Sequence, residues 1–192
     1  ITNGISIKDP LIALPSILKI IENKLIQGVV TGYYESIPQL TFVKSRIAFY
    51  DSIGPRDTQF WHCDPGSYRV LKALIYLNEV DEDGGPFEII KGSHINKFDN
   101  WDIETRHDHE KLQKIYDQNL FKKCLAKPGD VIFADATAFH RGNVPINKNR
   151  LILILNFCVH DEYGLPLGHV SSKSSSEKRC LSIFLKKLTT FY

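Results

Sequence analysis

From Leu40 onward the sequence is a succession of short segments rich in β-branched and aromatic residues, each bounded by Gly, Pro, Asp or Asn. The segments are LTFVKSRIAFY, TQFWH, YRVLKALIYL, FEII, VIFA and LILILNFCV. Runs of this kind are typical of β-strands. Because turns rather than regular helices separate them, the pattern favours a sandwich or jelly roll over a doubly wound parallel sheet. The chain has 192 residues, of which 43% are hydrophobic, and this is enough to form the core of one domain.

Segments outside these strands predict a smaller helical part. Residues 11–27 predict an amphipathic helix, interrupted at Pro15 and ended by Gly28, with a buried face made of Leu14, Leu18, Ile21 and Leu25. Residues 93–120 are polar and predict an insertion between core strands, with a short helix over 110–118. Serines at 171–176 predict a linker before a final docking element. We therefore expect one domain over 1–192, mainly β, with its jelly-roll core at roughly 40–160.

Charge and cysteine content narrow the function classes. Lysine and arginine exceed aspartate and glutamate by two, and no five like charges are consecutive, so a dedicated nucleic-acid binder is disfavoured. The longest apolar run, 151–159, is about half the length of a membrane helix, which predicts no membrane span. Four scattered cysteines indicate reduced thiols and a cytoplasmic protein. The chain starts at Ile1 and contains no methionine, which predicts a fragment or a processed chain.

Three polar side chains predict a metal site. Alternate residues of an extended segment face the same side, so His62 and Asp64 of the WHCD sequence point together. His140 follows 78 residues later, just beyond the strand-like VIFA. Two imidazoles and one carboxylate form the facial triad of non-haem Fe(II) enzymes, which leaves three metal positions open for other ligands. Taken alone, H-x-D is also typical of a histidine beside a capping aspartate.

Other residues near these motifs have predicted roles as well. Arg150 opens the apolar run LILILNFCV, where a guanidinium needs an anionic partner: either a bound dicarboxylate or one of the protein's own acids. Cys63 should face away from its two neighbours and be a buried, unreactive thiol. The glycines around His94 indicate turns, so we expect an architectural role there. His107 and His109 are predicted to be solvated.

The order of these motifs resembles the phytanoyl-CoA dioxygenase family of Fe(II)/2-oxoglutarate oxygenases. The resemblance rests on H-x-D, on GGPFEIIKGSH, on KPGDVIFADATAFHRGN, and on an arginine ten residues beyond the second histidine, together spanning roughly residues 40–160. It implies a double-stranded β-helix, which is a jelly roll with iron at its mouth. It also implies that His62, Asp64 and His140 bind iron, and that Arg150 binds the far carboxylate of 2-oxoglutarate.

Further residue roles follow from a similarity of residues 44–64 to the ectoine hydroxylase branch. Arg46 matches an arginine of that branch, and we expect it to contact the substrate. Ala48 replaces an asparagine that lies near the co-substrate, which argues against ectoine itself. Tyr68 stands where the branch has a pocket tryptophan and is a candidate co-substrate contact. Asp64 occupies the position that is small in related halogenases, so the resemblance implies hydroxylation of a small molecule with O₂, giving succinate and CO₂.

Two other readings stay open. KPGDVIFADATAFHRGN also resembles the second motif of a cupin, which would bind a metal without 2-oxoglutarate. Cupins have no need of Arg150, and their first motif has two histidines and a glutamate. A jelly-roll binding module without turnover is the second alternative, although the three ligand positions and the arginine are intact. Nucleic-acid demethylases carry a further arginine where this chain has Asn156, which disfavours that branch.

Overall fold

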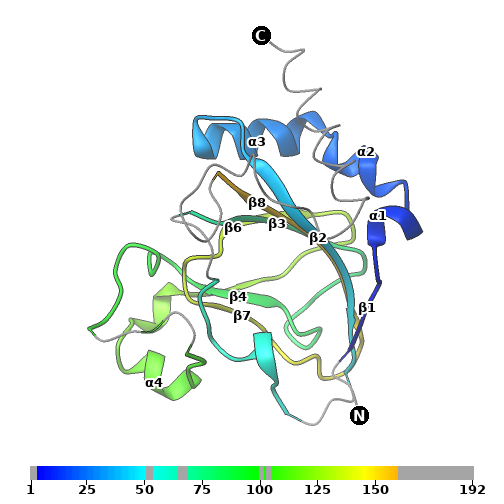
Figure 1. Ribbon diagram of the computed structural model, residues 1–192. Coiled ribbons are helices and arrows are strands. Elements are labelled where there is room, and N and C mark those ends of the chain that lie inside the picture. The colour runs from blue at the N-terminus through cyan, green and yellow to red at the C-terminus, as the bar shows by residue number, and fades with distance from the viewer. Residues whose placement is uncertain (1–3, 51–53, 65–68, 100–101, 103–104, 160–192) are drawn as a thin grey trace.

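The apolar segments form two antiparallel β-sheets in the computed structural model, which describes residues 4–50, 54–64, 69–99, 102 and 105–159. The larger sheet has the strand order β1-β2-β8-β3-β6, and the smaller sheet has the order β5-β4-β7. Figure 1 shows the sheets as two layers. This arrangement is the predicted jelly roll.

The larger sheet takes strands from both ends of the described chain. It consists of β1 (Gly4–Ser6), β2 (Gln39–Ala48), β3 (Leu71–Tyr76), β6 (Val131–Asp135) and β8 (Arg150–Cys158). The smaller sheet consists of β4 (Phe87–Ile90), β5 (Phe121–Cys124) and β7 (His140–Gly142). The sequence pattern predicted β2, β3, β4, β6 and β8, but it missed β1, β5 and β7. The missed strands are short, and none contains a run of apolar residues: GIS, FKKC and HRG.

Residue alternation in the larger sheet separates two apolar layers. In β3, Leu71, Ala73 and Ile75 pack into a cluster with the N-terminal helices, whereas Leu74 and Tyr76 pack with Phe87 of the smaller sheet. Successive side chains of a strand point to opposite faces, so one strand contributes to both layers. The space between the two sheets is where the polar residues of interest converge.

The N-terminal segment forms three short helices, which cover the outer face of the larger sheet (Figure 1). They are α1 (Pro10–Ala13), α2 (Ile17–Ile21) and α3 (Lys24–Tyr34). The predicted interruption at Pro15 is confirmed, but the predicted end at Gly28 was wrong, because Asn23 caps a further helix that continues through Gly28. Leu14 and Leu25 are consequently exposed, at 40% and 79%, while Ile21 is buried as predicted.

The residues between β4 and β5 form the predicted insertion. It contains α4 (His109–Gln113) and a 3-10 turn (Gln118–Leu120), so the helix is shorter than expected. Two glycines around β4 make the turns that the sequence predicts. Gly85 and Gly92 have φ angles of +70° and +81°, and a Cβ on Gly85 would lie 2.6 Å from the Pro145 nitrogen.

Two further predictions concern the C-terminal segment and a membrane span. The linker at 171–176 and the final docking element lie outside them. No helix within the described ranges is long and apolar enough to cross a membrane. The single-domain assignment for 1–192 stays a prediction.

Candidate active site

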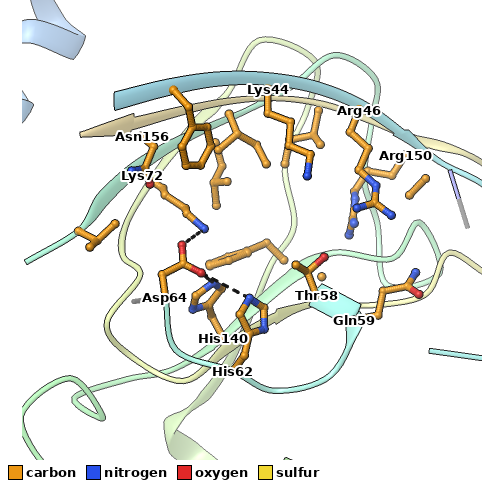
Figure 2. A pocket seen from close by; sticks show the side chains of 18 residues that line it. Lys44, Arg46, Thr58, Gln59, His62, Asp64, Lys72, His140, Arg150 and Asn156 are labelled. Carbon is orange, nitrogen blue, oxygen red and sulfur yellow. Dashed lines mark ion pairs between the residues drawn. The ribbon is translucent and has the colours of Figure 1, made fainter. Parts of the chain in front are cut away.

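A cavity of about 380 Å³ lies between the two sheets (Figure 2). Apolar side chains from β2, β3, β4 and β8 form much of its wall: Phe42, Leu74, Phe87, Ile152 and Ile154. Charged and polar side chains project into the same space, including His62, Asp64, His140, Lys44, Arg46, Lys72, Arg150 and Asn156. The cavity therefore combines an apolar wall with a small number of convergent polar groups, as small-molecule sites do.

Backbone pairing brings the two distant histidines together. The His62 N–H donates to the His140 carbonyl at 3.0 Å, and the His140 N–H donates to the His62 carbonyl at 2.9 Å. Residues paired in this way project their side chains to the same face, and the two ring centroids are 4.3 Å apart. Two residues further, the Asp64 N–H donates to the Ala136 carbonyl at 2.9 Å, which fixes the carboxylate beside both rings.

The three side chains form a compact group with one oxygen facing both rings. Asp64 Oδ1 lies 3.6 Å from His62 Nε2 and 3.6 Å from His140 Nε2. One ligand atom from each side chain lies within 4.8 Å of the others. The other oxygen, Oδ2, pairs with the Lys72 ammonium from β3 (Figure 2). Lys72 thus holds one carboxylate oxygen and leaves the other directed at the imidazoles.

The histidine tautomers suit metal binding. His62 Nδ1 is 2.8 Å from the Phe60 carbonyl, and His140 Nδ1 is 2.9 Å from the Ala138 carbonyl. A carbonyl oxygen can only accept, so each Nδ1 carries the proton and each neutral Nε2 presents its lone pair to Asp64. Backbone carbonyls commonly orient metal-binding histidines in this way.

Electrostatics keep the ligand atoms in the protonation states that a metal requires. Burial lowers the pKa of His62 and lowers that of His140 well below its usual value, so both rings are neutral at pH 7. Burial alone would raise the pKa of Asp64, but the Lys72 ammonium and, after it, the two imidazoles outweigh burial and lower the pKa. A pair of neutral imidazoles with one carboxylate fits a divalent iron centre with open positions.

Arg150 lies in the same cavity, and the described part of the chain provides no acidic partner for it. Arg150 is 7% exposed. Within the described residues its guanidinium makes one hydrogen bond, in which Nη1 donates to the Asn143 carbonyl at 3.3 Å. Nε is buried and has no partner among them. Burial lowers the pKa of Arg150 to about 10, which still leaves it cationic at neutral pH. Of the two partners predicted for this arginine, no acid within the described ranges pairs with it.

Glycine at position 142 makes room for this guanidinium. A Cβ on Gly142 would lie 2.7 Å from Arg150 Nη2 and 3.4 Å from Cζ. The guanidinium therefore packs directly against the backbone at the end of β7, and glycine is the residue at 142 that leaves space for it. An arginine that no described acid pairs with, in this space, fits a bound carboxylate, since the guanidinium donates in a planar fork.

The remaining predicted residues divide into three groups. Arg46 and Ala48 line the cavity, whereas Tyr68 lies outside the described residues. Cys63 is buried on the opposite side of the WHCD segment beside Trp61, as predicted, and burial raises its thiol pKa; that the thiol is unreactive stays a prediction. His94 is exposed at a turn, as expected.

The prediction for His107 was wrong. This histidine is 3% exposed, because it pairs with Trp61 in a β-bridge and its ring packs edge-on against Phe98 and Phe139. The charged neighbours of His107 in RHDHE suggested a solvated position, but its backbone pairs with Trp61 and turns the ring into the apolar cluster.

Sequence reasoning missed several polar residues of the cavity. Lys44, Lys72 and Asn156 lie within strands of the larger sheet and project into it. The signal was present, because a charged residue on the buried face of a strand is rare without a partner. The jelly roll with this cavity defines a protein with a candidate metal centre between its sheets.

Comparison with known proteins identifies the family. Residues 36–144 match the phytanoyl-CoA dioxygenase (PhyH) family, and the chain belongs to this family. It is 29% identical over 108 residues to the ectoine dioxygenase of Bordetella bronchiseptica. That match covers 47% of this chain and 35% of the relative, so the chain spans about a third of the length of the curated protein.

Solved structures share the fold at lower sequence identity. HygX from Streptomyces hygroscopicus, solved with nickel, 2-oxoglutarate and hygromycin B, has a TM-score of 0.61 at 14% identity, covering 81% of this chain and 69% of HygX. EctD from S. alaskensis, solved with 2-oxoglutarate and 5-hydroxyectoine, has a TM-score of 0.57 at 21% identity, covering 81% of this chain and 55% of EctD. These likenesses confirm the jelly-roll architecture.

Proposed function

We propose that this protein is an Fe(II)- and 2-oxoglutarate-dependent dioxygenase that hydroxylates a small molecule, with succinate and CO₂ as co-products. One observation carries the proposal: a His, Asp and His group lines the same cavity as a buried arginine that has no acidic partner among the described residues. The first would hold a metal with open positions, and the second would bind a carboxylate. Family membership supports the same conclusion.

Each residue of the site has a distinct role in this proposal. His62 Nε2, His140 Nε2 and Asp64 Oδ1 would hold Fe(II), and Arg150 would bind the distal carboxylate of 2-oxoglutarate. When bound, iron with 2-oxoglutarate and O₂ supplies the oxidant for a C–H bond. Arg46, on the wall formed by β2, would contact the substrate. The apolar side chains around Leu74 and Phe87 would exclude water from the reacting groups.

The carboxylate at position 64 supports hydroxylation rather than halogenation. Three protein ligands leave three positions of an octahedral metal, which 2-oxoglutarate as a two-atom chelator and O₂ would fill. A halide would then have no position of its own. Product analysis under ¹⁸O₂ with excess chloride tests this, because a chlorinated major product would contradict it.

Two binding measurements separate the proposal from its alternatives. Anaerobic calorimetry should show one Fe(II) or Ni(II) bound per chain, and a His62→Ala/His140→Ala double variant should lose it. His94→Ala is the matched control, since this exposed histidine lies outside the cavity. Arg150→Met should raise the 2-oxoglutarate dissociation constant by roughly thirtyfold or more, because a buried charge pair contributes about 2 to 5 kcal/mol.

The activity measurement is succinate formation with a panel of amino acids, acyl-thioesters, small alkaloids and sugars. A cupin without 2-oxoglutarate would bind metal but show no dependence on Arg150. A binding module would bind metal and 2-oxoglutarate, yet form no succinate with any compound. Stoichiometric metal in the double-histidine variant would overturn the proposed centre.

A further inference from the structure

The cavity has more positive charge than the proposed co-substrate needs. Four cationic side chains line it, Lys44, Arg46, Lys72 and Arg150, and Asp64 is the one carboxylate among the described residues of the lining. The lining histidines are neutral at pH 7, so four cations against one carboxylate leave a formal surplus of three positive charges. Lys44 and Arg46 are half-buried, and a charge partly removed from water without a counter-charge is unfavourable.

Metal and co-substrate would not remove this surplus. Fe(II) brings two positive charges and the 2-oxoglutarate dianion brings two negative charges, so the loaded cavity has the same excess as the empty one. The chelating carboxylate of the co-substrate belongs at the metal, and the distal one belongs at Arg150. Lys72 is already paired with Asp64. Lys44 and Arg46 therefore remain for another ligand.

Neither of these two side chains has a partner in the described part of the chain. On β8, the residues opposite Lys44 and Arg46 are Ile154 and Ile152, which offer no counter-charge. Both cations share one face of β2, since they are two residues apart. Figure 2 shows the Lys44 ammonium pointing from β2 into the cavity, between Lys72 and Arg46. Burial, followed by the charge of Arg46, lowers the pKa of Lys44.

We propose that Lys44, together with Arg46, binds an anionic group of the primary substrate, a carboxylate or a phosphate. This inference rests on the proposed function and adds the chemical class of its substrate. The anion would lie against β2, and the rest of the substrate would extend along the apolar wall toward His62 and His140. Neutral compounds of the same shape would leave both cations without a counter-charge and would bind poorly.

The test uses the protein loaded with Ni(II) and 2-oxoglutarate without O₂, and calorimetry at low ionic strength. Inorganic phosphate and acetate are the anionic probes, and acetamide is the neutral counterpart of acetate. We expect at least one anion to bind, with acetamide about tenfold or more weaker. Lys44→Met should weaken the anion by about tenfold or more, and Lys44→Arg should retain most of the affinity. Lys122→Met, an exposed lysine of β5, is the matched control and should have no effect.

The outcomes separate this inference from the proposed function. Phosphate and acetate tell whether the site prefers a phosphate or a carboxylate. If neither anion binds more tightly than acetamide, or if Lys44→Met binds the anion as well as the unaltered protein, the inference is wrong. If Lys44→Met instead weakens 2-oxoglutarate as much as Arg150→Met does, Lys44 is a co-substrate contact and the inference also fails. Loss of Ni(II) or 2-oxoglutarate binding in the unaltered protein would contradict the proposed function itself.

Discussion

Gly142→Ala should damage co-substrate binding while leaving the metal site intact. The glycine has no left-handed backbone, so alanine can adopt its conformation. The new Cβ, however, would lie 2.7 Å from Arg150 Nη2. Carbon and nitrogen atoms in ordinary contact are about 3.5 Å or more apart, so the guanidinium must move by roughly 1 Å. Arg150 is 7% exposed, and close-packed surroundings give it little room to do so.

The expected size of the effect follows from hydrogen-bond geometry. Arginine–carboxylate bonds are about 2.7–2.9 Å long, and a shift of roughly 1 Å takes them beyond bonding distance. Losing one hydrogen bond to a charged group costs about 1.5 to 3 kcal/mol, which raises the 2-oxoglutarate dissociation constant by about tenfold to 150-fold. The affinity for Ni(II) should stay within about twofold, because His62, Asp64 and His140 are not contacted.

Anaerobic calorimetry of 2-oxoglutarate into the Ni(II)-loaded protein measures this effect directly. Gly28→Ala is the matched control: Gly28 lies within α3, and a Cβ there meets nothing within 4 Å. That control should bind 2-oxoglutarate normally and should stabilise the fold by about 0.5 to 1 kcal/mol. An unchanged dissociation constant in Gly142→Ala, with normal metal binding and melting temperature, would refute the assignment of Arg150 to the co-substrate.

Three further predictions concern pH, the carboxylate ligand and stability. The pKa of His140 is lowered in the folded protein, so on acidification the unfolded chain binds a proton at this histidine before the folded chain does. The free energy of unfolding of the metal-free protein should therefore fall as pH drops below about 6.5, and the melting temperature should fall with it. Lys72→Met removes the cation that lowers the Asp64 pKa, so loss of Ni(II) on acidification should begin at higher pH than in the unaltered protein. Lys72→Arg keeps the cation and should lose Ni(II) at the same pH as the unaltered protein. Calorimetry of Ni(II) binding across pH values measures this, and identical curves for the two variants would contradict it. Tyr34→Phe removes a hydroxyl that donates to the Phe157 carbonyl at 2.6 Å and accepts from the Leu71 N–H at 2.9 Å, so urea unfolding should show a loss of about 1 to 3 kcal/mol, and no loss would mean that these bonds contribute nothing.

The sequence pattern predicted the strands that form runs of apolar, β-branched and aromatic residues and missed those that do not. In β3 the run from Leu71 to Tyr76 contains one charged residue, Lys72, and is visible in the sequence itself. β7 has three residues, and its place in the smaller sheet comes from pairing with β4. A strand this short has no local signal, because its stability comes from its partner strand rather than from its own residues.

At the N-terminus a clear local pattern was present, but it did not predict the ends of the helices. The spacing of apolar residues suggested one helix interrupted at Pro15, but the Asn23 cap divides the segment once more and begins a helix that continues to Tyr34. The buried residues of these helices pack against the larger sheet, and Leu25 is exposed although its spacing suggested burial. Local periodicity identifies an amphipathic segment but does not determine where its axis changes.

The sequence by itself determined the chemistry of the site in large part. The alternation of an extended segment places His62 and Asp64 on one face, because successive side chains of such a segment point in opposite directions. An arginine at the start of an apolar strand likewise indicates a buried charge that needs a counter-charge.

Only the tertiary structure decided which distant groups share one cavity. His140 meets His62 through two backbone hydrogen bonds across 78 residues of sequence, and Gly142 leaves the space that Arg150 occupies. Lys44 and Lys72 become neighbours of the site because β2 and β3 both pair with β8. Pairing between strands that are remote in the chain depends on the packing of both sheets, and no local pattern encodes that register.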